Sequence, residues 1–250
     1  MWALDAERSF PPMATQMTDR SPRMERAFDR MTDAYPIQPE ARTFSAARVY
    51  DKVGLMVVLA LVTGTYSYIA NNNALIFGGL ITGFVLSMVG IFRPATAKIV
   101  APLYALAEGL ALGGITAYYA TSSGIVPLAI LFTGGIFLGA MAVFRTGLVK
   151  ITPKFASMTF MALIGFLVTF IAVQVLGLPV PGLAGAGGMV VFGVFGIALG
   201  VACLFMDFNY IQVGEQRRLP ADGEWYGALM LMISLVFVYI NVLRVLGRRR

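Results

Sequence analysis

Long apolar segments alternate with short polar connections along most of the chain, after a polar region at its start. Seven of these segments are about 20 residues long, the length that a helix needs to cross a hydrocarbon layer of about 30 Å. They cover residues 53–70, 74–92, about 101–120, 125–144, 155–176, about 187–208 and 225–246. The pattern predicts an all-α integral membrane protein with seven transmembrane helices.

The first 45 residues differ from the rest because they are charged, rich in methionine and interrupted by five prolines. They contain no apolar stretch of the kind found in a cleaved signal peptide. We predict a mobile cytoplasmic tail over residues 1–45 and a seven-helix membrane domain over residues 46–250. A short amphipathic helix around residues 24–31, lying on the membrane surface, is the alternative for part of the tail.

The basic residues of the connections predict the orientation of the helices. The chain up to Lys52 holds eight Lys and Arg residues, and alternate connections after it hold two, three and two. The three connections between them hold none. Because basic loops stay on the cytoplasmic side, the N-terminus is predicted to be cytoplasmic. Four arginines at or beyond Arg244 then lie outside if the seventh segment crosses fully. A re-entrant last segment is the alternative, although its length and Trp225 favour a full crossing.

The alternation of tiny and basic connections groups the first six segments into three hairpins. The seventh segment has no partner, so we predict three hairpins around a central last helix. Glycines four residues apart favour close helix contacts at Gly79–Gly83, Gly135–Gly139 and Gly196–Gly200.

Composition excludes several kinds of chemistry. The chain is 58% hydrophobic and 13% charged, with a mean hydropathy of +0.77. It has no histidine and one cysteine, Cys203, inside an apolar segment. Ser-His-Asp and Cys-His catalysis, haem ligation and the usual zinc sites are therefore not available. We predict no enzyme activity and no cofactor. The net charge of +6 indicates contact with the lipid bilayer and its anionic headgroups, with no nucleic acid partner.

Two acidic residues, Glu108 and Asp207, lie in or beside apolar segments. A charged side chain at the centre of a bilayer costs about 2.5–3.5 kcal/mol or more, and such residues usually serve a pathway or a bundle interior. Glu108 lies about 15 Å along its segment from Lys98, among small neighbours. It is either a protonatable group on an ion path or a neutral acid bonded between helices.

The depth of Asp207 depends on where its helix ends. If the helix ends near residue 208, Asp207 lies at the cytoplasmic interface, and if it continues through Ile211 and Val213, Asp207 is inside. Arg93 closes the second segment on the cytoplasmic side. It is either an ordinary cytoplasmic anchor or a partner that reaches a carboxylate at the mouth of the bundle.

The stretches PLYALAEGLALGG, LFMDFNYIQVG, EWYGALMLM and VYINVLRVLG resemble the Bax-inhibitor (transmembrane Bax inhibitor motif) family, and more closely its bacterial branch. The resemblance covers roughly residues 50–250. It implies seven helices with the last one inside the bundle, in the bacterial inner membrane. It also implies a pH-sensitive calcium leak in which an aspartate late in the sixth helix shares a proton with an acid in the last helix and contacts an arginine of the second.

Asp207 matches the first of these acids, and Arg93 is the candidate arginine. The stretch VYIN is interpreted as placing Asn241 where the family has the second acid, and no Asp or Glu follows Glu224. An amide cannot share a proton with Asp207 on equal terms, so any pH gate is expected to shift or flatten. Ionised, Asp207 would be a transient calcium contact, because Ca²⁺ prefers carboxylate oxygens.

The sequence therefore favours a leak channel for calcium or other cations, tuned by protonation at Asp207. The alternative is a non-transporting regulator that binds another membrane protein, such as a membrane protease, through the tail and exposed helix faces. A secondary transporter is less favoured, because no pair of broken helices is visible in the sequence.

Overall fold

The structure, a computed structural model, describes residues 43–119, 124–175, 177 and 186–247. Its helices are α2 (Ala46–Ala70), α3 (Asn73–Phe92), α4 (Ala97–Tyr119), α5 (Ile125–Arg145), α6 (Pro153–Phe170), α7 (Ala186–Gln216) and α8 (Gly223–Leu246). A 3₁₀ turn, η3 (Pro94–Thr96), precedes α4, and a π-helical turn, η4 (Ile171–Val175), continues α6.

The prediction of an all-helical protein with seven membrane-spanning helices is confirmed. All seven helices are long and apolar enough to cross a membrane. Two of the helices extend well beyond their predicted segments, each at the end that leads into a polar region. α2 begins at Ala46, before residue 53, and α7 continues to Gln216, beyond residue 208. Hydropathy marks the apolar part of a helix, whereas the backbone hydrogen bonds continue into polar sequence. α8 is unbroken over 24 residues, as a full crossing requires.

Asparagines form the tight turn between α2 and α3. Asn71 ends α2 with a φ of 42°, a left-handed conformation that asparagine tolerates better than most residues. The side chain of Asn72 then accepts a hydrogen bond of 2.9 Å from the backbone nitrogen of Ala74 and caps α3. This connection reverses the chain in very few residues.

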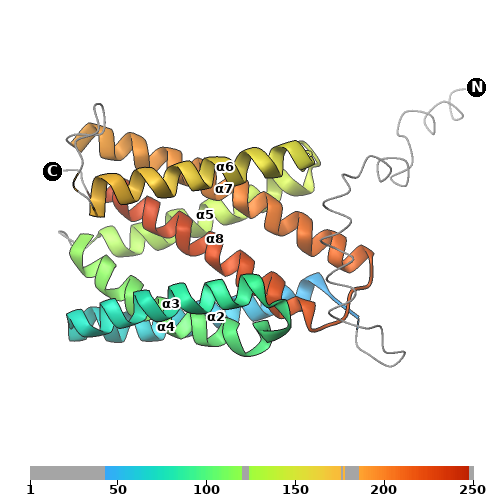
Figure 1. Ribbon diagram of the computed structural model, residues 1–250, viewed down its shortest axis with the longest axis horizontal. Coiled ribbons are helices and arrows are strands. Elements are labelled where there is room, and N and C mark those ends of the chain that lie inside the picture. Colours follow the sequence, from blue (N-terminus) through green and yellow to red (C-terminus); the bar gives the residue numbers. More distant parts are fainter. Residues whose placement is uncertain (1–42, 120–123, 176, 178–185, 248–250) are drawn as a thin grey trace, which may run out of the picture.

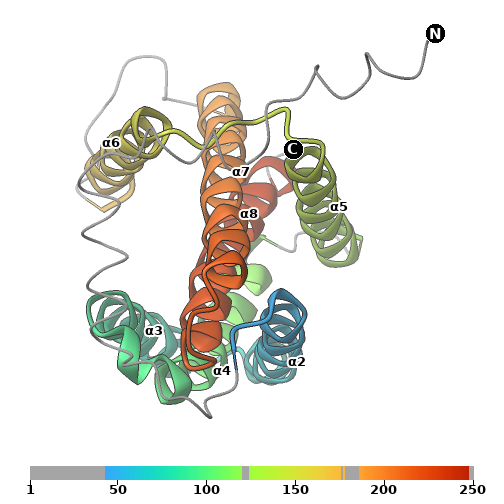
Figure 2. The same cartoon turned by 90° about the vertical axis from the view of Figure 1, so that its right-hand side faces the viewer.

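α8 lies at the centre of the bundle, as predicted, and α4 also lies inside it. Just over half of the spanning part of each of these two helices is buried (56%), against 11–39% for the other five. Figures 1 and 2 show α8 crossing the bundle, with the other helices around it. The chain reverses at each connection, but the pairs do not pack as simple hairpins. The largest contacts are α3 with α4, α2 with α4 and α7 with α8.

Two of the three predicted glycine pairs lie at helix contacts. A side chain at Gly79 or Gly83 would meet α4, and one at Gly196 or Gly200 would meet α8. The prediction for Gly135 and Gly139 is wrong, because a Cβ atom on either would have no neighbour within 4 Å. These glycines lie on an outer face of α5.

The last residues assigned to the tail are packed against the bundle. Thr43 forms a β-bridge with Pro220, and the backbone nitrogen of Phe44 donates a 2.7 Å hydrogen bond to the carbonyl of Leu219. The ring of Phe44 is buried (3% exposed) beside Tyr210. The folded unit therefore begins at or before Thr43. The predicted tail before it, including the helix around residues 24–31, lies outside the described residues.

Candidate functional site

Asp207 lies inside the bundle, where α7 packs against the central helix. α7 continues for more than two turns beyond it, so the helix does not end near residue 208. Only 5% of Asp207 is exposed. Its Oδ2 atom accepts a hydrogen bond of 2.5 Å from the Oγ atom of Ser234 on α8. Within the described part of the chain, no other hydrogen bond or ion pair reaches this carboxyl group.

Ser234, and not Asn241, is therefore the residue of α8 that faces Asp207. The expectation that Asn241 faces it is wrong by two helical turns, about 10.5 Å along α8. Asn241 packs against Gly196 on α7, which is eleven residues before Asp207. Because α7 and α8 are antiparallel, residues later in α8 lie beside residues earlier in α7. This register depends on packing and cannot be obtained from the letters VYIN.

Asn241 belongs to a second polar cluster near the end of α8. Its Nδ2 atom donates to the carbonyl of Phe237, and its Oδ1 atom accepts from Nη1 of Arg244, both at 2.8 Å. Arg244 is buried (3% exposed), with its guanidinium 5.2 and 5.3 Å from the ring centres of Phe170 and Phe192. Aromatic faces attract such a cation. Arg244 therefore packs in the bundle and is not part of the basic C-terminal end expected from the sequence.

Glu108 lies at the contact between α4 and α3, where Gly83 makes room for it. A Cβ atom at Gly83 would lie 2.6 Å from Oε2 of Glu108. No hydrogen bond or ion pair of Glu108 to another described residue is recorded. The structure brings Glu108 to a glycine, and no contact between Glu108 and Asp207 is recorded.

Arg93 ends α3 and is exposed. Its backbone nitrogen donates a 2.8 Å hydrogen bond to the carbonyl of Val89. Among the described residues, no ion pair joins its guanidinium to Asp207. The resemblance implies an aspartate in contact with a second acid and an arginine. Among the described residues, Asp207 contacts neither, and Ser234 lies where the second acid was expected.

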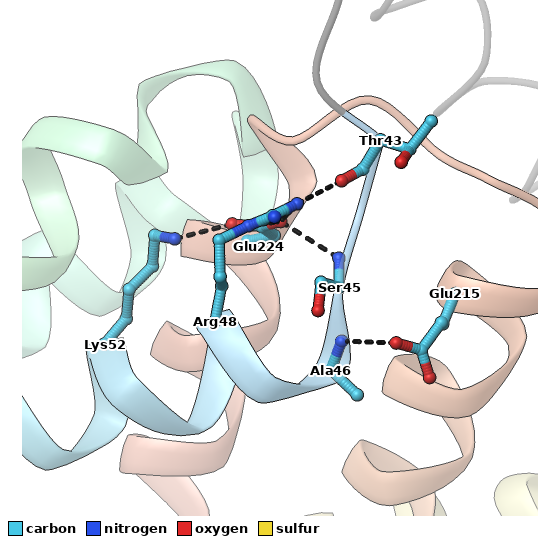
Figure 3. Close-up of polar contacts among 7 residues, drawn as sticks. All are labelled: Thr43, Ser45, Ala46, Arg48, Lys52, Glu215 and Glu224. Atoms are coloured by element: carbon cyan, nitrogen blue, oxygen red, sulfur yellow. Dashed lines mark hydrogen bonds and ion pairs between the residues drawn. The ribbon is translucent and has the colours of Figure 1, made fainter.

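A buried carboxyl group that the sequence did not identify lies at the start of α8. Glu224 is 1% exposed and forms ion pairs with Arg48 (2.7 Å) and Lys52 (2.6 Å) of α2. It also accepts a 3.0 Å hydrogen bond from the backbone nitrogen of Ser45. Figure 3 shows these donors converging on Glu224. Arg48 in turn donates to the carbonyl of Thr43.

The network of Glu224 joins the start of the folded chain to the last helix. One carboxylate meets two cations and a backbone donor, so the network holds one more positive than negative charge. Arg48 and Lys52, four residues apart at the start of an apolar segment, are a sequence signal of this network. Their partner, Glu224, lies more than 170 residues further along the chain. From the sequence alone, Arg48 and Lys52 indicate only the orientation of the first helix.

A preformed metal cage is not visible in the described residues. No group of three or more His, Cys, Asp and Glu side chains lies close enough together to hold an ion. A Ca²⁺ ion usually takes six to eight oxygen ligands. The described residues around Asp207 therefore do not form a site of this kind.

A family model described as Bax inhibitor 1 like matches residues 14–250, nearly the whole chain. The match begins within the predicted tail and extends through the last helix. No curated protein matches the chain.

Proposed function

Because the chain belongs to the Bax inhibitor 1 like family, we propose that it is a membrane leak channel for calcium or other cations, modulated by protonation of Asp207. The observation that supports this most is the burial of Asp207 where α7 packs against the central α8, with the hydroxyl of Ser234 as its one hydrogen-bond donor among the described residues. Ionisable groups in such positions usually belong to a pathway. The proposal includes a bacterial inner membrane and a cytoplasmic N-terminus.

In this proposal Asp207 is the group whose charge sets the cost of a cation nearby. Ionised, it attracts a cation, and protonated, it does not. Ser234 takes the place of a second acid, so the two residues cannot share a proton as a pair of carboxyl groups does. Glu108 is proposed as a further protonatable group on the pathway, and Arg93 as a cation at its mouth.

Calcium entry into proteoliposomes tests the channel directly. We expect entry through the wild type at neutral pH and a loss of at least tenfold in Asp207→Asn. Asp222→Asn is the matched control, because Asp222 is an exposed carboxyl group in the turn before α8. Equal entry in Asp207→Asn and the wild type would contradict the role of Asp207, and no entry in any variant would contradict the channel.

The alternative is a non-transporting regulator of another membrane protein. The network at Glu224 favours one form of it, because it holds the first described residues after the predicted tail against the start of α8. Removing residues 1–42 keeps Thr43 to Ser45 in place and removes only the tail. A leak should survive this truncation, whereas a regulator that binds through the tail should lose its partner.

A further inference from the structure

The residues that lead into α2, residues 43–46, lie against the turn between α7 and α8. We call them the entry strap. A carboxylate on each side of the turn holds their backbone. Glu215, at the end of α7, accepts a 3.0 Å hydrogen bond from the backbone nitrogen of Ala46. Glu224, at the start of α8, accepts one of the same length from Ser45 (Figure 3).

The side chain of Phe44 in the entry strap fills the space between α7 and α8 where the two helices meet their turn. A Cβ atom at Gly214 on α7 would lie 3.2 Å from the ring, and one at Gly223, at the start of α8, would lie 3.6 Å from it. Because both positions are glycines, the ring reaches the backbone of both helices. Only 3% of Phe44 is exposed, so it closes this end of the contact between them.

Two tyrosine rings continue from Phe44 towards Asp207. The ring centre of Tyr210 lies 6.3 Å from that of Phe44, and the ring centre of Tyr226 on α8 lies 5.5 Å from that of Tyr210. Along α7, Tyr210 lies between Asp207 and Gly214 and about one helical turn from each. The three residues share one face of the helix. Three aromatic rings therefore occupy the interval between Asp207 and the α7–α8 turn.

The entry strap can leave without separating α7 from α8. Its recorded attachments are the hydrogen bonds of its backbone, the contact of Arg48 with the carbonyl of Thr43 and the ring of Phe44. α7 and α8 pack extensively on each other along their length, and this packing does not involve the strap. Local opening of a segment held by few contacts costs less than unfolding of the whole protein.

We propose that the entry strap is a gate, which closes the route from the α7–α8 turn to Asp207 while Phe44 is in place and opens it when Phe44 leaves. The hydroxyl of Tyr210 borders the space that Phe44 fills, 3.6 Å from a Cβ atom at Gly223. The Tyr210 ring therefore gains room to turn away from Asp207 once Phe44 has left. The gate rests on the proposed function, because it regulates the leak only if Asp207 lies on the cation pathway.

Thiol labelling beside Asp207 tests the gate without measuring conduction. Ser234→Cys in a Cys203→Ser background provides the thiol, in full-length protein in lipid nanodiscs, where both ends of the bundle are accessible. The probe is a small cationic methanethiosulfonate. Phe44→Ala should speed labelling about tenfold or more, because labelling of a buried group follows the population of the open form. Phe166→Ala is the matched control, since Phe166 is also buried (7% exposed) and packs on α7 and α8 through other rings. Equal rates in the two variants would overturn the proposal.

A disulfide bond that holds the entry strap in place tests the gate without removing any packing. Thr43 and Pro220 lie opposite each other in an antiparallel bridge, where Cα atoms are about 4.5–5.5 Å apart. This is within the range of about 4.4–6.8 Å found for disulfides. With Thr43→Cys and Pro220→Cys added, oxidation should slow the labelling of Ser234→Cys about tenfold, because the strap can no longer open. Reduction should restore the rate. The same rate before and after oxidation would overturn the proposal.

Calcium entry into proteoliposomes separates the gate from the leak that it regulates. If both exist, Phe44→Ala should admit calcium faster than Phe166→Ala, in parallel with its faster labelling. Faster labelling without calcium entry in any variant would support the gate and contradict the leak. Calcium entry with equal labelling in Phe44→Ala and Phe166→Ala would support the leak and overturn the gate.

Discussion

At the scale of single residues, few of the described groups around Asp207 could balance a charge on its carboxyl group. Its recorded partner is a serine hydroxyl, which can donate only one hydrogen bond. By contrast, Glu224 receives two cations and a backbone donor. The two buried carboxyl groups are thus in opposite settings. Glu224 joins α8 to α2, whereas the carboxyl group of Asp207 has a neutral hydroxyl beside it.

A second acid opposite Asp207 should create a coupled pair. In Ser234→Asp, two carboxyl groups would lie within hydrogen-bonding distance, and both cannot ionise cheaply. We expect the calcium flux to begin to fall at a higher pH than in the wild type, because the pair keeps one proton up to a higher pH. The measurement is calcium entry into proteoliposomes as a function of pH.

The control for this variant is Asn241→Asp. That change places an acid beside Arg244 and two helical turns from Ser234. It should leave the shape of the pH profile unchanged. A larger shift of the profile to higher pH in Asn241→Asp than in Ser234→Asp would contradict the register of α7 and α8.

Removing the charge of Glu224 should destabilise the bundle. Glu224→Gln keeps the size of the side chain but leaves Arg48 and Lys52 without their anion. We expect the free energy of unfolding to fall by about 1.5–3 kcal/mol, the value of hydrogen bonds to charged groups. Thermal unfolding in detergent measures this. Glu215→Gln is the control, because Glu215 is exposed and its side chain accepts a hydrogen bond from the backbone nitrogen of Ala46, with no ion pair to another described residue. Equal effects of the two changes would contradict the account.

At the scale of helices, close approach depends on which face a glycine occupies. Gly79 lies where α3 meets α4, and a Cβ atom there would come within 2.6 Å of the carbonyl oxygen of Ala107. Its neighbour Gly78 has nothing within 4 Å. The backbone of α4 cannot move aside easily, so the two glycines should respond in opposite ways to the same substitution.

We therefore predict that Gly79→Ala destabilises the protein by about 1–3 kcal/mol through overpacking. Gly78→Ala should be neutral or stabilising by up to about 1 kcal/mol, because alanine favours helices more than glycine does. Thermal unfolding of the two variants is the measurement. A Gly79→Ala variant as stable as Gly78→Ala would show that α3 and α4 are not in close contact.

The helices were predictable from the sequence, and the contacts between them were predictable only in part. Runs of apolar residues located all seven spans, because lipid requires this pattern of any helix that crosses it. Gly135 and Gly139 have the same spacing as Gly79 and Gly83, yet they face outwards. Spacing along one helix does not show which face another helix covers. For the same reason the sequence identified Asp207 but assigned it Asn241 as a neighbour.

At the scale of the whole molecule, the connections lie at two ends of the bundle. Figure 1 shows the α7–α8 turn at the end where Glu224 meets α2, and the C-terminal end of α8 at the other. The basic connections that predict the cytoplasmic side follow α3, α5 and α7. A protein with this charge distribution should have a single orientation in the membrane.

Cysteine labelling tests the orientation. Cys203 is the only native cysteine, so Cys203→Ser provides a background without thiols. In intact cells, a membrane-impermeant maleimide should label Gly124→Cys, in the turn before α5, but not Lys150→Cys, in the connection after it. Lys150→Cys should become reactive once the cells are opened. The reverse pattern would show that the N-terminus is outside.

The central claim is that the protonation of Asp207 controls a cation leak, and the pH profile of calcium entry into proteoliposomes tests it most directly. Between about pH 5 and pH 8, wild-type entry should decrease as the pH falls, because a protonated Asp207 no longer attracts the cation. Asp207→Asn should give low entry that does not change with pH. An unchanged pH profile in Asp207→Asn would contradict the account.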